Sequence, residues 1–225
     1  MNVENIDAVL YDFGGVFTLS PFEEVENWGR QIGVPPGEKL LEIIFGPYHE
    51  DTDHPWHRVE RGEVSLLEAR EEIIQIGAEK GIDSDLFKIF ARMSHADGAR
   101  QDVLERALAI ARCGYATALV TNNAEEFRER WMAMIPTNDL FDVIIDSSEV
   151  GIRKPDPRIF QMALEKLGGV SPERSLFLDD LETNVVAARR LGIHGVVVEN
   201  DPAETLDVLD RLIEIRHGST APFSG

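Results

Sequence analysis

Five short and mostly apolar runs recur along the chain, and they end at polar or glycine-containing turns. They cover residues 8–11, 116–120, 143–145, 175–178 and 195–198. Apolar runs of this length without a polar alternation are typical of strands that are buried on both faces. The pattern therefore predicts five strands of a parallel sheet.

Helix-period stretches separate these runs, at residues 99–112, 125–134, 156–167 and 183–191. Asp156 followed by Pro157 is a helix start, with an N-cap and a proline at the first helical position, and Gly168 marks the end of that helix. Alternating strands and helices predict βαβ units. We therefore expect an α/β fold, a doubly wound parallel sheet with helices on both faces.

The spacing of hydrophobic residues changes in residues 18–96, a segment that is called the insert below. Helical stretches dominate there, at residues 22–32, 39–45, 66–76 and 84–93, with almost no strand-like run. Ser65 and Glu68 form the sequence pattern of a capping box. We expect three parts: an α/β core domain (residues 1–17 and 97–217), a helical domain (18–96) and a flexible tail (218–225).

Composition narrows the class of protein. The 225 residues are 43% hydrophobic, as in globular proteins, and their formal net charge is −19. Such acidity argues against binding to nucleic acid or to anionic membranes. The single cysteine, Cys113, excludes an internal disulfide and is interpreted as a buried thiol near a helix end. With no leader-like or membrane-spanning run, we expect a cytoplasmic protein.

Polar residues follow the predicted strands at their carboxyl ends, where open α/β sheets bind ligands. Three carboxylates, a hydroxyl, an amide, a lysine and a glycine turn would meet at one edge. In chain order these residues are Asp12, Gly14, Thr121, Asn122, Lys154, Asp179 and Asp180.

This set suits phosphoryl transfer. Mg²⁺ prefers oxygen ligands, which Asp12, Asp179 and a backbone carbonyl of the glycine turn would supply. The cation and Lys154 would offset the charge of a phosphate, and the Thr121 hydroxyl with nearby N–H groups would hold its oxygens. An aspartate carboxylate can also act as a nucleophile and form an aspartyl phosphate that water hydrolyses.

Four motifs in order carry a resemblance to a known family: strand–Asp12, strand–Thr121, Lys154-Pro155 and strand–Asp179-Asp180. This order resembles the haloacid dehalogenase-like superfamily of phosphatases. The resemblance implies that the insert is a helical cap domain, in which residues 60–65 resemble a recurrent turn.

The same resemblance implies a role for each site residue. Asp12 would be the nucleophile and a metal ligand, with Gly14 (through its carbonyl) and Asp179 as further Mg²⁺ ligands. Asp180 would assist the metal site, and Asn184 would support the loop that follows. The residues that would bind phosphate are Thr121, Asn122 and Lys154.

The first motif departs from the family pattern at Gly14. The family usually has a second aspartate there, as general acid and base, and such catalysis contributes roughly 10²- to 10⁴-fold. Either the substrate has an easily departing leaving group, such as an anomeric sugar phosphate or an acyl phosphate, or an insert residue or water replaces the acid. The Asp-x-Gly-Gly variant resembles a subgroup of sugar-1-phosphate phosphatases and of domains fused to epoxide hydrolases or acyl-CoA dehydrogenases.

The sequence thus predicts an Mg²⁺-dependent phosphatase of a small phosphorylated metabolite, acting as a monomer or homodimer. Three alternatives stay open: a metal-independent haloacid dehalogenase, a non-catalytic protein that binds Mg²⁺ and phosphate, and a phosphomutase. The segment 48–57 is rich in histidines and acids, but its spacing fits no strong zinc pattern. His54, His57 and Arg61 are candidates for contacting the leaving group.

Overall fold

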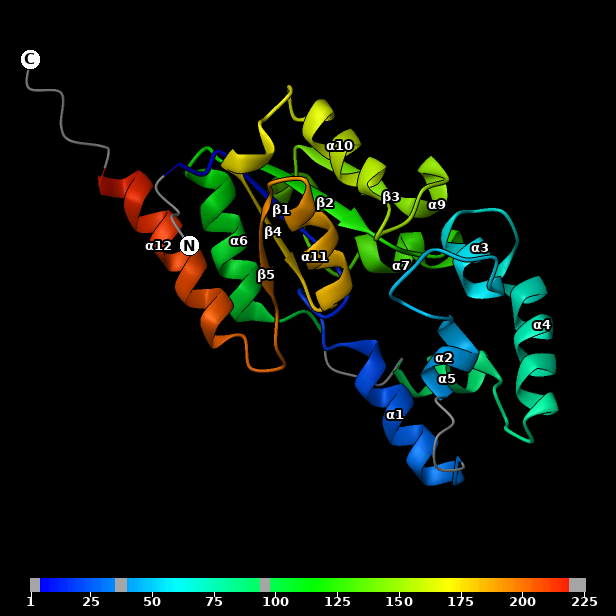
Figure 1. Cartoon of the computed structure of the whole chain (residues 1–225). Helices are drawn as coiled ribbons and strands as arrows, with labels where there is room; N and C mark the ends of the chain where they lie inside the picture. Colours follow the sequence, from blue (N-terminus) through cyan, green and yellow to red (C-terminus); the bar gives the residue numbers. More distant parts are fainter. Residues whose placement is uncertain (1–4, 35–39, 94–97, 219–225) are drawn as a thin grey trace, which may run out of the picture.

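A computed structural model of the chain, which describes residues 5–34, 40–93 and 98–218, has one central sheet of five parallel strands (Figure 1). The strand order is β3-β2-β1-β4-β5, and every neighbouring pair is parallel. The strands are β1 (Ala8–Tyr11), β2 (Ala116–Thr121), β3 (Val143–Asp146), β4 (Ser175–Asp179) and β5 (His194–Val197). The predicted α/β fold is confirmed.

Two helical layers cover the sheet, and each contributes to its own hydrophobic core. Val9 and Tyr11 of β1 pack in the core with α6 (Gln101–Arg112) and α12 (Ala203–Gly218). Ala8 and Leu10 pack in the core with α10 (Pro157–Lys166) and α11 (Glu182–Arg190). Both faces of the strands are therefore buried, which explains why the sequence shows continuous apolar runs. The helices of this part are α6 (Gln101–Arg112), α7 (Arg128–Met132), α8 (Thr137–Leu140), α9 (Ser147–Val150), α10 (Pro157–Lys166), α11 (Glu182–Arg190) and α12 (Ala203–Gly218).

Local helix signals mostly behave as the sequence predicts. The Asp156 side chain caps α10 by accepting from Arg158 N–H, and Pro157 is its first residue. The stretch expected to be one helix at 125–134 is instead a 3₁₀ turn, η1 (Glu125–Phe127), followed by α7. Cys113 follows α6 as expected but is half-buried rather than buried. Within the described ranges, every helix is too short or too polar to span a lipid bilayer.

The insert folds as a group of helices on one side of the sheet, away from α12 (Figure 1). Its own core includes Trp28, Ile43, Trp56 and Ile73, joined by Ala124 from the segment after β2. The helices are α1 (Pro21–Ile32), α2 (Leu40–Phe45), α3 (Pro55–Glu60), α4 (Leu66–Glu79) and α5 (Leu86–Met93). The division into core and helical domains stays a prediction. Residues 94–97, at its boundary, and 219–225, in the expected tail, lie outside the described residues.

Helix α3 was missed by the sequence analysis because, unlike the equally short α2, it has few large apolar residues, only Trp56 and Val59 besides Pro55. Its start signal is His54, whose Nδ1 accepts from Trp56 N–H at 3.2 Å, followed by Pro55 at the first position. His57 on α3 is fully buried, and its Nδ1 accepts from Thr52 N–H at 3.0 Å. These contacts hold the loop before α3 against the helix.

Burial of these two histidines predicts a pH dependence of stability. Burial, with the charge of Arg153, lowers the pKa of His57 to about 3, and burial lowers that of His54 to about 4. An unfolded histidine titrates near 6.5, so below this pH the unfolded chain binds protons that the folded chain does not. The contribution of these two histidines to the free energy of unfolding should therefore fall as the pH falls from 7 to 5.5, by up to about 1.4 kcal/mol per pH unit for each histidine.

Denaturant unfolding at several pH values measures this slope. His57→Gln should remove the share of the slope that this histidine contributes, whereas His49→Gln, at an exposed histidine, should leave the slope unchanged. An unaltered slope in His57→Gln would contradict the assignment of the effect to this buried ring.

Candidate active site

Strand order brings the predicted site residues to one edge of the sheet. Asp12 follows β1, which lies between β2, ending at Thr121, and β4, ending at Asp179. The Asp12 N–H donates to Leu178 O at 2.8 Å, so the turn after β1 stays attached to β4. Three separate motifs of the sequence therefore meet at the carboxyl ends of three adjacent strands.

Lys154 lies at the centre of this edge as a buried cation. Its Nζ is 2.8 Å from Asp12 Oδ1 and 2.7 Å from Asp179 Oδ2, and its side chain is only 1% exposed. Burial disfavours the charged amine, but the two carboxylates outweigh burial and raise the pKa of Lys154 above its ordinary value. The amine is therefore charged and bridges two strand ends.

Asp179 is fully buried and held by several donors. Its Oδ1 accepts from Leu181 N–H at 2.8 Å, and its Oδ2 accepts from Asn184 Nδ2 at 3.0 Å and from Lys154. Asn184 is in the first turn of α11, so this helix orients the carboxylate. Burial raises the pKa of Asp179 to about 6, although the charge of Lys154 opposes the shift.

Asp180 completes a cluster of carboxylates that fits a cation. One ligand atom from each of Asp12, Asp179 and Asp180 lies within 4.8 Å of the others. Burial and then the charges of the other two carboxylates raise the pKa of Asp180 to about 8. Its Oδ2 is buried without a hydrogen-bond partner in the part of the chain that the structure describes. With all three carboxylates ionised and Lys154 positively charged, the cluster has a net charge of −2. A set of oxygen ligands with this charge suits Mg²⁺.

Asn122 holds the backbone of Lys154. Its Oδ1 accepts from Lys154 N–H at 2.7 Å, and its Nδ2 donates to Lys154 O at 3.0 Å. The Lys154–Pro155 peptide bond is cis. The Asn122 side chain is thus engaged in orienting the lysine, while Thr121 is a buried residue at the end of β2. Contact of Thr121, Asn122 or Lys154 with phosphate stays a prediction.

Gly15 makes room for Asp180. Its φ is +71°, and a Cβ on residue 15 would lie 2.2 Å from Cγ of Asp180. Residue 15 must therefore lack a side chain for the carboxylate to occupy its place. Sequence reasoning identified a glycine turn here but not this close approach. It also missed Arg100, whose Nη1 donates to Gly15 O at 3.0 Å.

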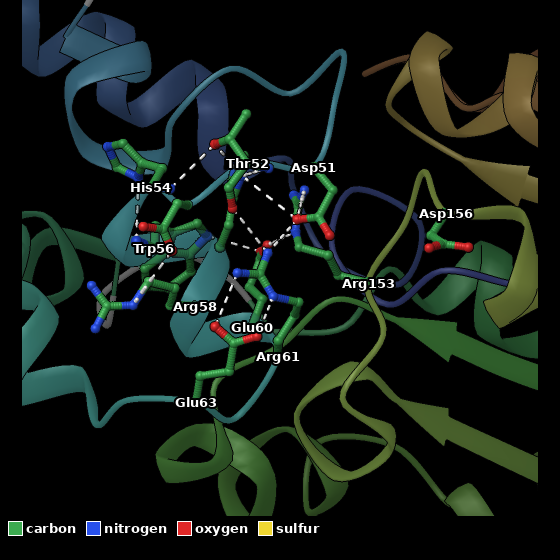
Figure 2. Close-up of polar contacts among 12 residues, drawn as sticks. Asp51, Thr52, His54, Trp56, Arg58, Glu60, Arg61, Glu63, Arg153 and Asp156 are labelled. Carbon is green, nitrogen blue, oxygen red and sulfur yellow. Dashed lines mark hydrogen bonds and ion pairs between the residues drawn. The ribbon is translucent and has the colours of Figure 1, made fainter.

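A buried ion pair joins the insert to the edge of the sheet. Nε of Arg153 is 2.6 Å from Oε2 of Glu60 at the end of α3, and Trp56 Nε1 donates to Glu60 Oε1 at 2.8 Å. Figure 2 shows Arg153 among the insert residues, with Asp156 standing apart from them. Sequence analysis missed this pair. The only signal was an arginine directly before the candidate lysine.

The candidate leaving-group residues are engaged within the insert. His54 and His57 bond to the loop and helix described above. Arg61 donates to Thr52 O at 3.0 Å and forms ion pairs with Asp51 and Glu63 (Figure 2). These contacts give the three side chains a structural role, and their contact with a substrate stays a prediction.

Comparison with known proteins supports a single family. A family model described as haloacid dehalogenase-like hydrolase matches residues 6–192. Acyl-CoA dehydrogenase family member 10 of Mus musculus is 32% identical over 92% of this chain, but the match spans only 19% of that protein. A phosphatase of Mycobacterium tuberculosis is 28% identical, over 87% of this chain and 88% of that protein.

A solved structure has the same fold. It is a HAD family enzyme from Bacteroides thetaiotaomicron in complex with magnesium and inorganic phosphate. The TM-score is 0.59 at 23% identity, and the match covers 87% of this chain and 96% of that one.

The close approach of Gly15 predicts that Gly15→Ala destabilises the protein more than an equivalent change elsewhere. A left-handed backbone costs a non-glycine residue about 1–2 kcal/mol. The clash with Asp180 should add about 1–3 kcal/mol, as overpacking does. Gly81→Ala is the matched control, because Gly81 has a φ of +68° with open space around it. Thermal unfolding of both variants compares the two sites, and equal losses would show that the contact with Asp180 does not matter.

Proposed function

Because the chain belongs to the haloacid dehalogenase-like hydrolase family, we propose that it is a magnesium-dependent phosphatase of small phosphate esters, with Asp12 as its nucleophile. The observation that carries the proposal is the cluster in which Lys154 bridges Asp12 and Asp179 beside Asp180. This cluster combines a carboxylate nucleophile, a fixed cation and a set of oxygen ligands within one edge of the sheet.

Exposure and hydrogen bonding assign different roles to two of the carboxylates. The Asp12 side chain is 12% exposed, whereas that of Asp179 is fully buried and held through both oxygens. A nucleophile must reach its substrate, so the more accessible Asp12 is the attacking group. Asp179, which is fixed, would hold Mg²⁺ together with Asp12, and the carbonyl of Gly14 and the Asp180 carboxylate would complete the site.

The reaction would proceed in two displacements on phosphorus. A carboxylate oxygen of Asp12 forms a bond to phosphorus while the bond to the leaving-group oxygen breaks, and that oxygen departs with the electron pair. Water then attacks the phosphorus of the aspartyl phosphate, which releases inorganic phosphate and restores Asp12. Bound Mg²⁺ would neutralise charge on the phosphoryl oxygens. Lys154 contributes a second, fixed positive charge, and Thr121 would bind phosphoryl oxygens.

The other reaction of this fold, dehalogenation, also uses an aspartate nucleophile but needs no metal. A cluster of three carboxylates with one buried, unpartnered oxygen on Asp180 is unfavourable without a cation and useful with one. The carboxylate cluster thus favours the phosphatase. We further propose that the insert is the cap of the active site, which would exclude water during the reaction.

The nucleophile assignment predicts that Asp12→Asn abolishes phosphate release. An amide cannot replace the carboxylate in forming the O–P bond, so the loss should be at least about 10³-fold. The assay measures inorganic phosphate released from a panel of phosphate esters with Mg²⁺ and with excess chelator. Asp139→Asn, at an exposed aspartate, is the control and should retain full activity. Activity that persists in Asp12→Asn or with chelator would refute the proposed mechanism.

The glycine at position 14 predicts a preference for easily departing leaving groups. Wild-type protein should hydrolyse sugar 1-phosphates faster than sugar 6-phosphates, because no side chain at residue 14 can protonate the leaving oxygen. Gly14 is not among the glycines with a positive φ, so its backbone conformation is one that other residues also adopt. Gly14→Asp should raise kcat for sugar 6-phosphates by up to about 10²-fold, because it restores an acid at this position. The difference in rate between sugar 1-phosphates and sugar 6-phosphates should then become smaller. Equal rates for both substrate classes in the wild type would contradict this explanation.

A further inference from the structure

Arg153 and Lys154 are adjacent in sequence, but their side chains enter two different ion clusters. Lys154 Nζ binds Asp12 and Asp179 at the edge of the sheet. Arg153 Nε binds Glu60, which ends α3 in the insert, 93 positions away in sequence. The backbone between the two side chains therefore links the insert directly to the proposed active site.

We propose that Glu60 is a positioning residue, which holds Arg153 and thereby fixes Lys154 between Asp12 and Asp179. This inference rests on the proposed phosphatase function, because it concerns the lysine of that same site. Glu60 touches none of the reacting groups in this scheme and acts only through Arg153.

The Glu60 carboxylate is a rigid anchor. The residue is 3% exposed, and each of its oxygens accepts a bond, from Arg153 at 2.6 Å and from Trp56 Nε1 at 2.8 Å. Trp56 is itself buried in the core of the insert. A charge-assisted bond of this length is directional. The carboxylate thus transmits the position of α3 to the guanidinium.

Asp51 is a second acidic partner of Arg153, but its contact is longer than that of Glu60. The guanidinium is fully buried, Asp51 approaches its Nη1 only to 3.5 Å, and Nη2 has no hydrogen-bond partner in the described ranges. Loss of Glu60 would leave a buried charge poorly compensated, so Arg153 would have to move.

The segment before α10 is held from two sides. On the sheet side, Asn122 pairs with both the N–H and the C=O of Lys154. On the insert side, Glu60 holds the side chain of the preceding residue. Without Glu60, the lysine backbone keeps its attachment to Asn122, but the side chain of the preceding residue keeps only the longer contact with Asp51.

Glu60 is also a candidate for the acid missing at Gly14, but its contacts argue against that role. Burial raises the pKa of Glu60, yet Arg153 and Trp56 both donate to it and favour the anion. Protonation would remove the partner of a buried guanidinium. The carboxylate therefore orients the site and does not donate a proton to the substrate.

Two variants at the boundary between the insert and the sheet test whether Glu60 positions Lys154. Glu60→Gln keeps the size of the side chain and a bond from Trp56 but removes the charge that holds Arg153. We expect kcat to fall about 10- to 100-fold through displacement of Lys154, with a much smaller change in KM. Glu126→Gln weakens a different contact between the insert and the rest of the chain, in which Leu66 N–H donates to Glu126 Oε1 at 2.7 Å, and should leave kcat near the wild-type value. Equal losses in both variants would show general loosening of the insert and overturn the proposal.

A double variant tests whether Glu60 acts through Arg153. If it does, Glu60→Gln combined with Arg153→Lys should lower kcat no further than Arg153→Lys alone, because the same link is already broken. Fully additive losses would overturn the proposal. Glu60→Asp, which restores the charge on a shorter side chain, should recover part of the activity, and it also serves if Glu60→Gln folds poorly.

Hydrogen exchange separates this inference from the proposed function. The Lys154 amide, bonded to Asn122, should exchange faster in Glu60→Gln than in wild type or Glu126→Gln. This readout requires no turnover. Absence of phosphatase activity in the wild type would refute the function, whereas unchanged exchange at residues 152–156 in Glu60→Gln would refute the positioning role alone.

Discussion

The ammonium group of Lys154, buried between Asp12 and Asp179, is the interaction on which the rest of the site depends. Three carboxylates at neighbouring strand ends repel one another, and burial makes that repulsion stronger because water is excluded. One fixed cation makes the arrangement possible without neutralising it. The remaining negative charge would attract the divalent cation of the proposed site.

Every other feature of the site keeps that lysine and its partners in place. Asn122 holds the lysine backbone, Asn184 and the turn after β4 hold Asp179, and Gly15 leaves space for Asp180. The order of the strands puts β1 in the middle of the sheet, so that Asp12 has a functional neighbour on either side. A parallel sheet is well suited to this because all its carboxyl ends lie at one edge.

The insert is more than a cover in this arrangement. Its α3 ends in a carboxylate that reaches the residue before Lys154, so the insert and the edge of the sheet share one buried ion pair. Buried pairs contribute less to stability than to geometry, because desolvation offsets much of their attraction. A pair at this position is therefore best explained by what it orients. Because Gly14 has no side chain, the proposed reaction would depend more on the leaving group and on the fixed charges.

The sequence by itself determined the class of fold and the chain order of the four motifs. Strands buried on both faces leave continuous apolar runs, and polar residues at their ends stand out against them, as Asp12, Thr121 and Asp179 do. Helix α10 could also be predicted from the sequence, because the N-cap Asp156 and the first helical residue Pro157 are local signals that need no distant partner. No single apolar run, however, indicates which strands are its neighbours in the sheet. Helix α3 has too few apolar residues to be recognised from their spacing.

Only the tertiary structure decided which distant residues meet. Glu60 and Arg153 are 93 positions apart, and each alone is an ordinary charged residue whose default place is the surface. The need for glycine at position 15 arises from the carboxylate of Asp180, which follows another strand, and not from the turn alone. Such contacts depend on the packing of the insert against the sheet, and packing is a property of the whole chain, which local patterns do not encode.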